Sequence, residues 1–298
     1  MEKLSFIAKD GKKICYRVWR ARNPKGLLQI SHGMAESPVR YDGFAEFMNE
    51  NGFTVFSDDQ RAHGDTDNCS GYCKGDNFSD TISDMAELNA IMRKEYPTLK
   101  LVFFGHSYGS FLAQAFLEEH GDIVDGFILG GSAYMAGATA VAGSVISGVN
   151  CFLGRSKKPA KLLAQMSFGS YNKKYKDGTT FISSIPKECD SYNKNPECGF
   201  ILSYNFYRYM FKAFGRIYKK KNYQKIDVNK KVLIISGKDD PVGGFGKLTK
   251  KLYDFYINKV KMQNVELLFY DGGVRHEYLN DTSKEVARKD ILKFCENI

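Results

Sequence analysis

The stretch that decides the fold of this protein is residues 101–120, LVFFGHSYGSFLAQAFLEEH. Its first four residues form an apolar run typical of a buried strand, and residues 110–120 have the pattern of a helix. Between them stands Gly105-His106-Ser107-Tyr108-Gly109, a G-x-S-x-G sequence on a tight turn from strand to helix. The two glycines remove the Cβ atoms that would collide with the neighbouring strand and helix. This context predicts that the hydroxyl of Ser107 is exposed at the sheet edge and acts as a nucleophile.

A serine nucleophile needs a base, because its hydroxyl is weakly nucleophilic near neutral pH, and a third group must orient that base. Four of the five histidines lie in tight turns, in the G-x-S-x-G turn itself (the elbow, residues 105–109) or at a helix end: His32, His63, His106 and His120. We expect the first two to hydrogen-bond loop backbone. His276 remains, in a loop that follows the last apolar strand and a turn with two glycines. We therefore expect His276 to be the base.

The orienting acid should follow another strand end, between the nucleophile and the base in chain order. The apolar run at residues 232–236 is such a strand, and two adjacent carboxylates follow it, those of Asp239 and Asp240. Successive side chains point in different directions, so only one of the two can meet the imidazole. The residues alone leave both candidates open.

The tetrahedral intermediate of acyl transfer needs backbone N–H groups that bind its oxyanion. One donor is expected from Tyr108, directly after the nucleophile. The other is expected from Met34, in the turn that follows the apolar strand at residues 27–31. These two N–H groups are the candidate oxyanion hole.

The rest of the chain alternates strand-like runs with helical periodicity. A hairpin is expected at residues 4–19, strands at 27–31, 53–57, 101–104, 127–129, 232–236 and 265–270, and helices at 44–50, 80–96, 110–120, 245–260 and 282–297. Asp80 is the expected cap of the second helix. The alternation predicts an α/β fold whose mostly parallel sheet carries helices on both faces, with ligand chemistry at the carboxyl ends of the strands.

The charge is unevenly distributed along the chain. Residues 133–231 contain 18 Lys or Arg and 5 Asp or Glu, a local net charge of +13, whereas the remainder carries −4. We therefore predict a core formed by residues 1–132 and 226–298 and an inserted, mainly helical cap at residues 133–225. Aromatic and Met side chains in residues 204–214 fit one face of a cap helix. The small residues at 136–149 are typical either of a mobile lid edge or of a tightly packed helix.

Composition excludes several classes of protein. The 298 residues are 43% hydrophobic and 26% charged, which is typical of a folded domain. Seven scattered cysteines and an N-terminus without a secretory-type apolar run favour a reducing cytoplasm. Cys69 and Cys73 have the spacing of metal ligands, but no second pair follows, so we expect no metal site there. The serine, histidine and aspartate chemistry described above needs neither a metal nor an organic cofactor. A net charge of +9 without a recognition motif does not indicate nucleic-acid binding.

The sequence resembles the α/β-hydrolase superfamily and, within it, the family of monoacylglycerol lipases, lysophospholipases and serine aminopeptidases. The resemblance is carried by the elbow and by four further motifs, His32-Gly33-Met34-Ala35-Glu36 followed by Arg40-Tyr41, Asp59-Gln60-Arg61-Ala62-His63-Gly64, Gly237-Lys238-Asp239-Asp240-Pro241-Val242-Gly243 and Arg275-His276-Glu277. It favours Asp240 over Asp239 as the acid. The chain departs from the family at Ala62, where Gly is usual, and at Ser37-Pro38, where His-Ser is usual. We expect Pro38 to reshape the loop near Met34.

The resemblance implies a serine hydrolase that cleaves carboxylic esters, of the monoacylglycerol or lysophospholipid type, through an acyl-Ser107 intermediate. One alternative is an amide, an N-terminal peptide bond or a thioester as substrate. A site for a free amine would need acidic residues, however, and residues 133–231 contain only five. Another is a non-catalytic ligand-binding protein of the same fold, against which the complete set of site residues argues. The basic cap suggests peripheral contact with an anionic membrane surface, the alternative being that its charges only keep it soluble.

Overall fold

The computed structural model describes residues 1–298, apart from the side chain of Thr139. Its strands form one sheet with the order β1-β2-β4-β3-β5-β6-β7-β8. Their bounds are β1 (Glu2–Ile7), β2 (Lys13–Trp19), β3 (Gly26–Ser31), β4 (Phe53–Asp58), β5 (Lys100–His106), β6 (Gly126–Gly130), β7 (Lys231–Gly237) and β8 (Val265–Tyr270). The pairs β1–β2 and β2–β4 are antiparallel, and all the others are parallel. The predicted hairpin and mostly parallel α/β sheet are confirmed.

The register of the parallel strands brings their carboxyl ends to one edge of the sheet. Ser31 pairs with Gly105, His106 with Gly130 and Gly237 with Tyr270. The loops that follow these strands carry all the predicted site residues. They leave the sheet at this same edge, which is where parallel α/β sheets bind their ligands.

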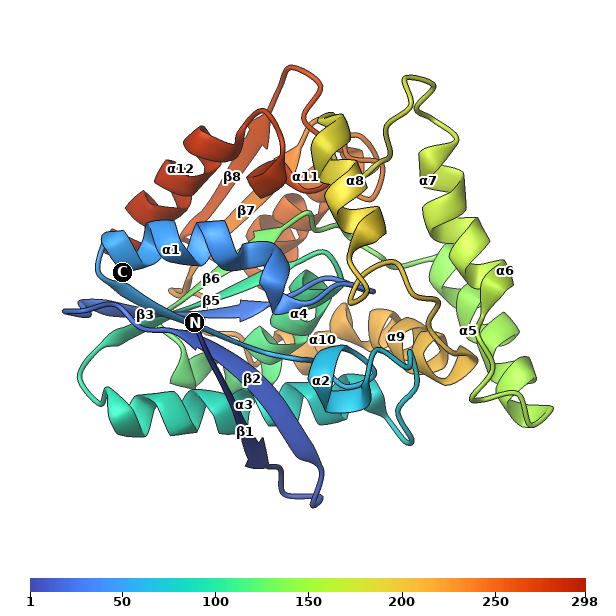
Figure 1. Ribbon diagram of the computed structural model, residues 1–298, viewed down its shortest axis with the longest axis horizontal. Coiled ribbons are helices and arrows are strands. Elements are labelled where there is room, and N and C mark those ends of the chain that lie inside the picture. Colours follow the sequence, from blue (N-terminus) through green and yellow to red (C-terminus); the bar gives the residue numbers. More distant parts are fainter.

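Helices cover both faces of the sheet, as Figure 1 shows. On one face lie α1 (Asp42–Glu50) and α12 (Lys284–Glu296), and on the other α3 (Asn77–Glu95), α4 (Tyr108–His120) and α11 (Lys247–Phe255). A separate hydrophobic cluster fills each interface, because the central strands are apolar on both sides. Between β4 and α3 lies the short α2 (Gly64–Asp67).

The helix predicted to start at Asp80 begins three residues earlier. Its cap is Asp76, whose Oδ1 accepts a hydrogen bond from the Ser79 N–H at 3.1 Å. The buried ring of Phe78 extends the apolar stripe of α3 towards the N-terminus, so the first turn packs as well. Asp80 instead lies 3.5 Å from the Arg61 guanidinium.

The chain between β6 and β7 is mainly helical, and Figure 1 shows these helices along the side where the parallel strands end. They are α5 (Ala138–Phe152), α6 (Lys161–Ala164), α7 (Ser170–Asn172), α8 (Pro186–Lys194), α9 (Tyr204–Ile217) and α10 (Lys220–Tyr223). A π-helical turn, Gln165–Gly169, joins α6 to α7. The helix α5 packs along α9, so the small residues near its start belong to a packed helix. Among the described helices, none is long and apolar enough to span a membrane.

Candidate active site

Ser107 lies at the turn between β5 and α4 with φ 54° and ψ −120°, a conformation that L-residues rarely adopt. Its N–H donates to the Gly130 carbonyl at 2.9 Å, which fixes the turn against β6. A Cβ atom at Gly105 would lie 2.3 Å from the Gly109 carbonyl oxygen, and one at Gly109 would lie 2.0 Å from that of Ser31. Only glycine fits at these two positions, as the sequence predicts.

The structure places His276 beside Asp240 and not beside Asp239. His276 Nδ1 lies 2.9 Å from Asp240 Oδ2, and both side chains are buried. The second carboxylate oxygen of Asp240 accepts the Val242 N–H at 2.8 Å, which fixes the plane of the carboxylate. The side chain of Asp239 is exposed, and its backbone carbonyl accepts the Tyr175 hydroxyl at 2.5 Å.

Burial and the neighbouring Asp240 act on the pKa of the His276 imidazole in opposite directions. Burial disfavours the imidazolium, but the charge and hydrogen bond of Asp240 outweigh burial and raise the pKa of His276 above its ordinary value. Because a carboxylate can only accept, the neutral ring carries its proton on Nδ1. Nε2 is then free to accept a proton.

Ser107 and His276 line one narrow cavity, together with Met34. Within the described part of the chain, no hydrogen bond joins the Ser107 hydroxyl to His276. Such contacts often tighten only when substrate binds. The cap supplies the apolar part of the wall, with side chains from four residues, Phe168, Phe181, Ile182 and Tyr192.

The two candidate oxyanion donors lie next to this cavity. Tyr108 is the first residue of α4, so its N–H has no acceptor inside the helix, and the helix N-terminus favours negative charge. Among the described residues, the Met34 N–H has no hydrogen-bond acceptor. The preceding residue is close to Ser107, since a Cβ atom at Gly33 would lie 3.2 Å from the Ser107 Cβ.

Two buried histidines hold the loop that contains Met34. His32 Nε2 accepts the Gln60 N–H at 3.2 Å, and its Nδ1 lies 2.8 Å from the Gly33 carbonyl. His63 Nε2 accepts the Ala35 N–H at 3.0 Å. Burial lowers the pKa of both, that of His63 to about 4, so the rings stay neutral and can accept these bonds. The predicted bonding of His32 and His63 to loop backbone is confirmed.

Sequence reasoning missed a group of buried charged residues at the wall of the cavity. Glu36 Oε1 accepts the Tyr41 hydroxyl at 2.8 Å and also the Gly33 N–H. Burial, reinforced by the charge of Glu277, raises the pKa of Glu36 to about 7. Glu277 forms a buried ion pair with Arg40. Sequence analysis named Glu36, Arg40, Tyr41 and Glu277 only as members of the family motifs. No local pattern in the sequence predicted that their side chains meet.

The two departures from the family have local explanations. Ala62 has φ 75°, a left-handed conformation that costs a residue with a Cβ atom about 1–2 kcal/mol. This is why Gly is usual at the position. Pro38 is the first residue of a 3₁₀ helix, Pro38–Tyr41, where a missing N–H costs little.

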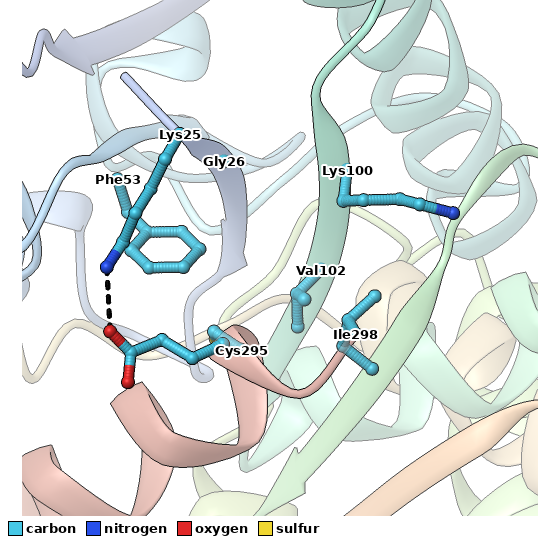
Figure 2. A pocket seen from close by; sticks show the side chains of 8 residues that line it. Lys25, Gly26, Phe53, Lys100, Val102, Cys295 and Ile298 are labelled. Atoms are coloured by element: carbon cyan, nitrogen blue, oxygen red, sulfur yellow. Dashed lines mark hydrogen bonds and ion pairs between the residues drawn. The ribbon is translucent and has the colours of Figure 1, made fainter. Parts of the chain in front are cut away.

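A second cavity lies at the opposite edge of the sheet, where β3, β4 and β5 begin (Figure 2). One wall carries an ion pair between Lys25 and Glu296 at 2.7 Å. None of the predicted site residues lines this cavity, and parallel sheets bind ligands at the other edge. Among the described residues, no group of three or more His, Cys, Asp or Glu could hold a metal ion. We therefore assign the site to the Ser107 cavity.

Comparison with known sequences supports the same family. The family described as serine aminopeptidase, S33, matches residues 22–283. Monoacylglycerol lipase of Mycolicibacterium smegmatis is 29% identical over 133 residues, which are 44% of this chain and 47% of that protein. Monoglyceride lipase of Rattus norvegicus is 27% identical over 125 residues, 42% of this chain and 41% of that protein. The chain thus spans less than half the length of these curated relatives.

Solved structures resemble the chain over its whole length. A thermostable carboxyl esterase from Bacillus coagulans, in complex with glycerol, has a TM-score of 0.89 at 25% identity and covers 100% of this chain and 98% of its own. A soluble variant of monoglyceride lipase from Saccharomyces cerevisiae has a TM-score of 0.74 at 18% identity, with coverage of 99% and 96%. With the family match extending over most of the sequence, the chain belongs to the serine aminopeptidase S33 family of α/β-hydrolases.

Proposed function

We propose that this protein hydrolyses carboxylic esters through an acyl intermediate on Ser107. The observation that carries the proposal is the buried contact between His276 and Asp240 at 2.9 Å, because His276 lines the same cavity as Ser107. In this assignment His276 is the base and Asp240 orients it. The N–H groups of Met34 and Tyr108 bind the oxyanion.

The chemistry follows from these positions. The Ser107 oxygen attacks the carbonyl carbon while its proton passes to His276 Nε2, and the carbonyl oxygen becomes the oxyanion. The imidazolium then protonates the departing alcohol, which leaves an acyl-serine. Water attacks this ester, gives its proton to the same imidazole, and the acid is released as Ser107 recovers its proton. The steps use groups of this chain and water.

We propose a monoacyl lipid ester, of the monoacylglycerol or lysophospholipid type, as the substrate. Apolar cap side chains line the cavity next to the nucleophile, which suits an acyl chain. Similar proteins are named monoacylglycerol lipase, monoglyceride lipase and carboxyl esterase. Both observations favour an ester with an apolar acyl group.

The proposed contact with an anionic lipid surface is best supported on α5. Its exposed apolar side chains are spaced by four, four and three residues, which places them on one helix face, Val141, Val145, Val149 and Phe152. Exposed cations follow directly, Arg155, Lys157, Lys158 and Lys161. An apolar face bordered by cations suits an anionic interface. The lysines at 219–221, at the start of α10, are exposed as well, but among the described residues no exposed large apolar side chain adjoins them in the sequence.

Hydrolysis of aminoacyl amides is the second candidate, because two carboxylates line the cavity and could face a free amine. The two are already engaged, however. Glu277 is paired with Arg40, and burial raises the pKa of Glu36 to about 7, so neither offers a full unpaired charge at neutral pH. In the cap, Asp177 and Glu197 are paired with Arg275 and Arg17. These pairings favour an ester over a substrate with a free amine.

A substrate panel tests the proposed function. Turnover is measured on p-nitrophenyl esters of increasing acyl length, monoacylglycerols, lysophospholipids, acyl thioesters and aminoacyl amides. We expect esters to be hydrolysed with kcat/KM at least about 100-fold above that for amides, and Ser107→Ala to be inactive on all of them. Preference for aminoacyl amides or thioesters would contradict the ester assignment, and inactivity on the whole panel would contradict hydrolysis.

A further inference from the structure

Arg275, the residue directly before His276, is buried with 6% of its surface exposed, and its guanidinium reaches into the cap. Nη1 donates to the Thr180 carbonyl at 2.8 Å, to the Ser183 carbonyl at 3.2 Å and to the Thr179 hydroxyl. Nη2 donates to Asp177 Oδ2 at 2.6 Å. One side chain of the core therefore serves four acceptors within seven residues of the cap.

The same guanidinium lies over the ring of Tyr175, 3.9 Å from its centroid. The hydroxyl of Tyr175 donates in turn to the carbonyl of Asp239, directly before the candidate acid. Cap residues 175–183 are therefore attached to both loops, the one that carries Asp240 and the one that carries His276.

The backbone of the candidate base is bonded to the same cap segment. The His276 N–H donates to the Phe181 carbonyl at 3.2 Å, and the Glu277 N–H donates to the Ile182 carbonyl at 2.8 Å. The rings of Phe181 and His276 have centroids 5.5 Å apart. The position of the imidazole thus depends on where the cap segment lies.

Asp281 provides a second attachment close by. Its buried Oδ2 accepts the N–H of Arg275 at 2.9 Å and that of Ser184 at 3.0 Å. One carboxylate oxygen thus connects the loop that carries His276 with the cap, next to the backbone of Arg275.

We propose that Arg275 is a positioning residue whose guanidinium clasps cap residues 177–183 onto the loop of His276, and that this clasp holds the imidazole at its working distance from Asp240 and Ser107. The proposal rests on the proposed function, since it takes His276 as the base. Arginine suits the task because its planar fork serves several acceptors at once, whereas lysine presents a single point charge. A displacement of about 1 Å in a catalytic group can cost about 100-fold in rate.

The test compares Arg275→Met, Arg275→Lys and Asp177→Asn in the full chain with a soluble p-nitrophenyl ester. We expect Arg275→Met to lower kcat per fluorophosphonate-titrated site by about 10- to 100-fold while KM changes less than about threefold. Arg275→Lys should not restore kcat, because it keeps the charge but not the fork. Asp177→Asn should lower kcat less than Arg275→Met does, because the neutral acceptors of Thr179, Thr180 and Ser183 still hold the guanidinium.

Arg93→Met is the matched control for lost packing and hydrogen bonds. Arg93 also donates to two carbonyls and a carboxylate, those of Ile123, Leu99 and Asp125, but at the opposite edge of the sheet. The Arg93→Met variant should have a lower melting temperature than wild type and a kcat within about twofold of wild type.

A kcat for Arg275→Met within about twofold of that for Arg93→Met, in protein of native circular dichroism, would overturn the clasp. Should Arg275→Met not fold, Arg275→Lys decides by the same criterion. Failure of the proposed function is distinguishable, because it would show as wild-type protein that does not react with the fluorophosphonate.

Discussion

Oδ2 of Asp240 and Nδ1 of His276 lie 2.9 Å apart, and the two residues are 0% and 3% exposed. The two residues follow neighbouring parallel strands, β7 and β8, so the pairing of those strands brings them together although 36 residues separate them. In a buried environment a charged hydrogen bond of this kind is stronger than in water. It fixes the tautomer and orientation of the imidazole and stabilises its protonated form.

This contact predicts different effects of mutation at the two adjacent aspartates. Asp240→Asn keeps the shape but removes the charge and the acceptor for Nδ1–H, so kcat should fall by about 10⁴. Asp239→Asn is the matched control; its carboxylate is exposed and kcat should change less than about threefold. Steady-state kinetics on one p-nitrophenyl ester distinguishes them, and the reverse ranking would move the acid to Asp239.

The pH dependence of activity follows from the raised pKa of His276. A general base must be neutral, so kcat/KM should fall as pH decreases through this pKa, with a midpoint above the ordinary histidine value of about 6.5. Asp240→Asn removes the charge that raises the pKa, so the midpoint of its residual activity should move to lower pH. Glu36→Gln is the control, because Glu36 also titrates, at about 7, and the acid limb should persist without it. A wild-type midpoint below 6.5, or one that Asp240→Asn leaves in place, contradicts this assignment.

The close contact at the elbow predicts a large effect on stability. Gly109→Ala would place a Cβ atom 2.0 Å from a backbone oxygen of Ser31, and we expect the free energy of unfolding to fall by about 3 kcal/mol. Gly148→Ala, in α5, is the matched control, since a Cβ atom there would meet nothing within 4 Å. It should raise the unfolding free energy by about 0.5–1 kcal/mol. Urea denaturation followed by circular dichroism measures both; equal effects would mean that the elbow tolerates a side chain.

The proposed interfacial face of α5 predicts a dependence on lipid charge. Activity on a monoacylglycerol should be higher in anionic than in neutral vesicles, and the gain should shrink at high salt. Val145→Ser with Phe152→Ser, or Lys158→Glu with Lys161→Glu, should remove most of the gain and leave turnover of a soluble ester unchanged. Charge reversal at Lys219, Lys220 and Lys221 is the control and should have little effect. Equal rates on both vesicle types, insensitive to salt and to all of these changes, would exclude docking and leave the esterase proposal intact.

The sequence predicts those parts of the site whose chemistry is local. The elbow was predictable because Gly105, Ser107 and Gly109 occur in one turn, and the sheet because apolar strands alternate with helices. Asp239 and Asp240 are adjacent, and the sequence does not say which of the two carboxylates the loop turns towards His276. In the structure the Val242 N–H donates to Asp240 and fixes its carboxylate.

The parts that sequence reasoning missed depend on contacts between distant segments. Arg275 and Thr179 are 96 residues apart, and Arg40 and Glu277 are 237 apart. No periodicity or motif spacing predicts that such side chains meet. The N-terminal capping residue of α3 was predicted wrongly, although capping depends only on nearby residues. Asp76 and Asp80 are both good capping residues, and the burial of Phe78 decides between them.

Labelling of Ser107 tests the central claim most directly. Wild-type protein is incubated with a fluorophosphonate, its intact mass is measured, the labelled peptide is sequenced, and Ser107→Ala is treated in parallel. We expect one adduct, on Ser107, with ester hydrolysis lost in proportion to labelling, whereas Ser107→Ala should remain unlabelled with kcat lower by about four to six orders of magnitude. An adduct on another residue, or a Ser107→Ala variant that is still labelled and still hydrolyses esters, would contradict the account.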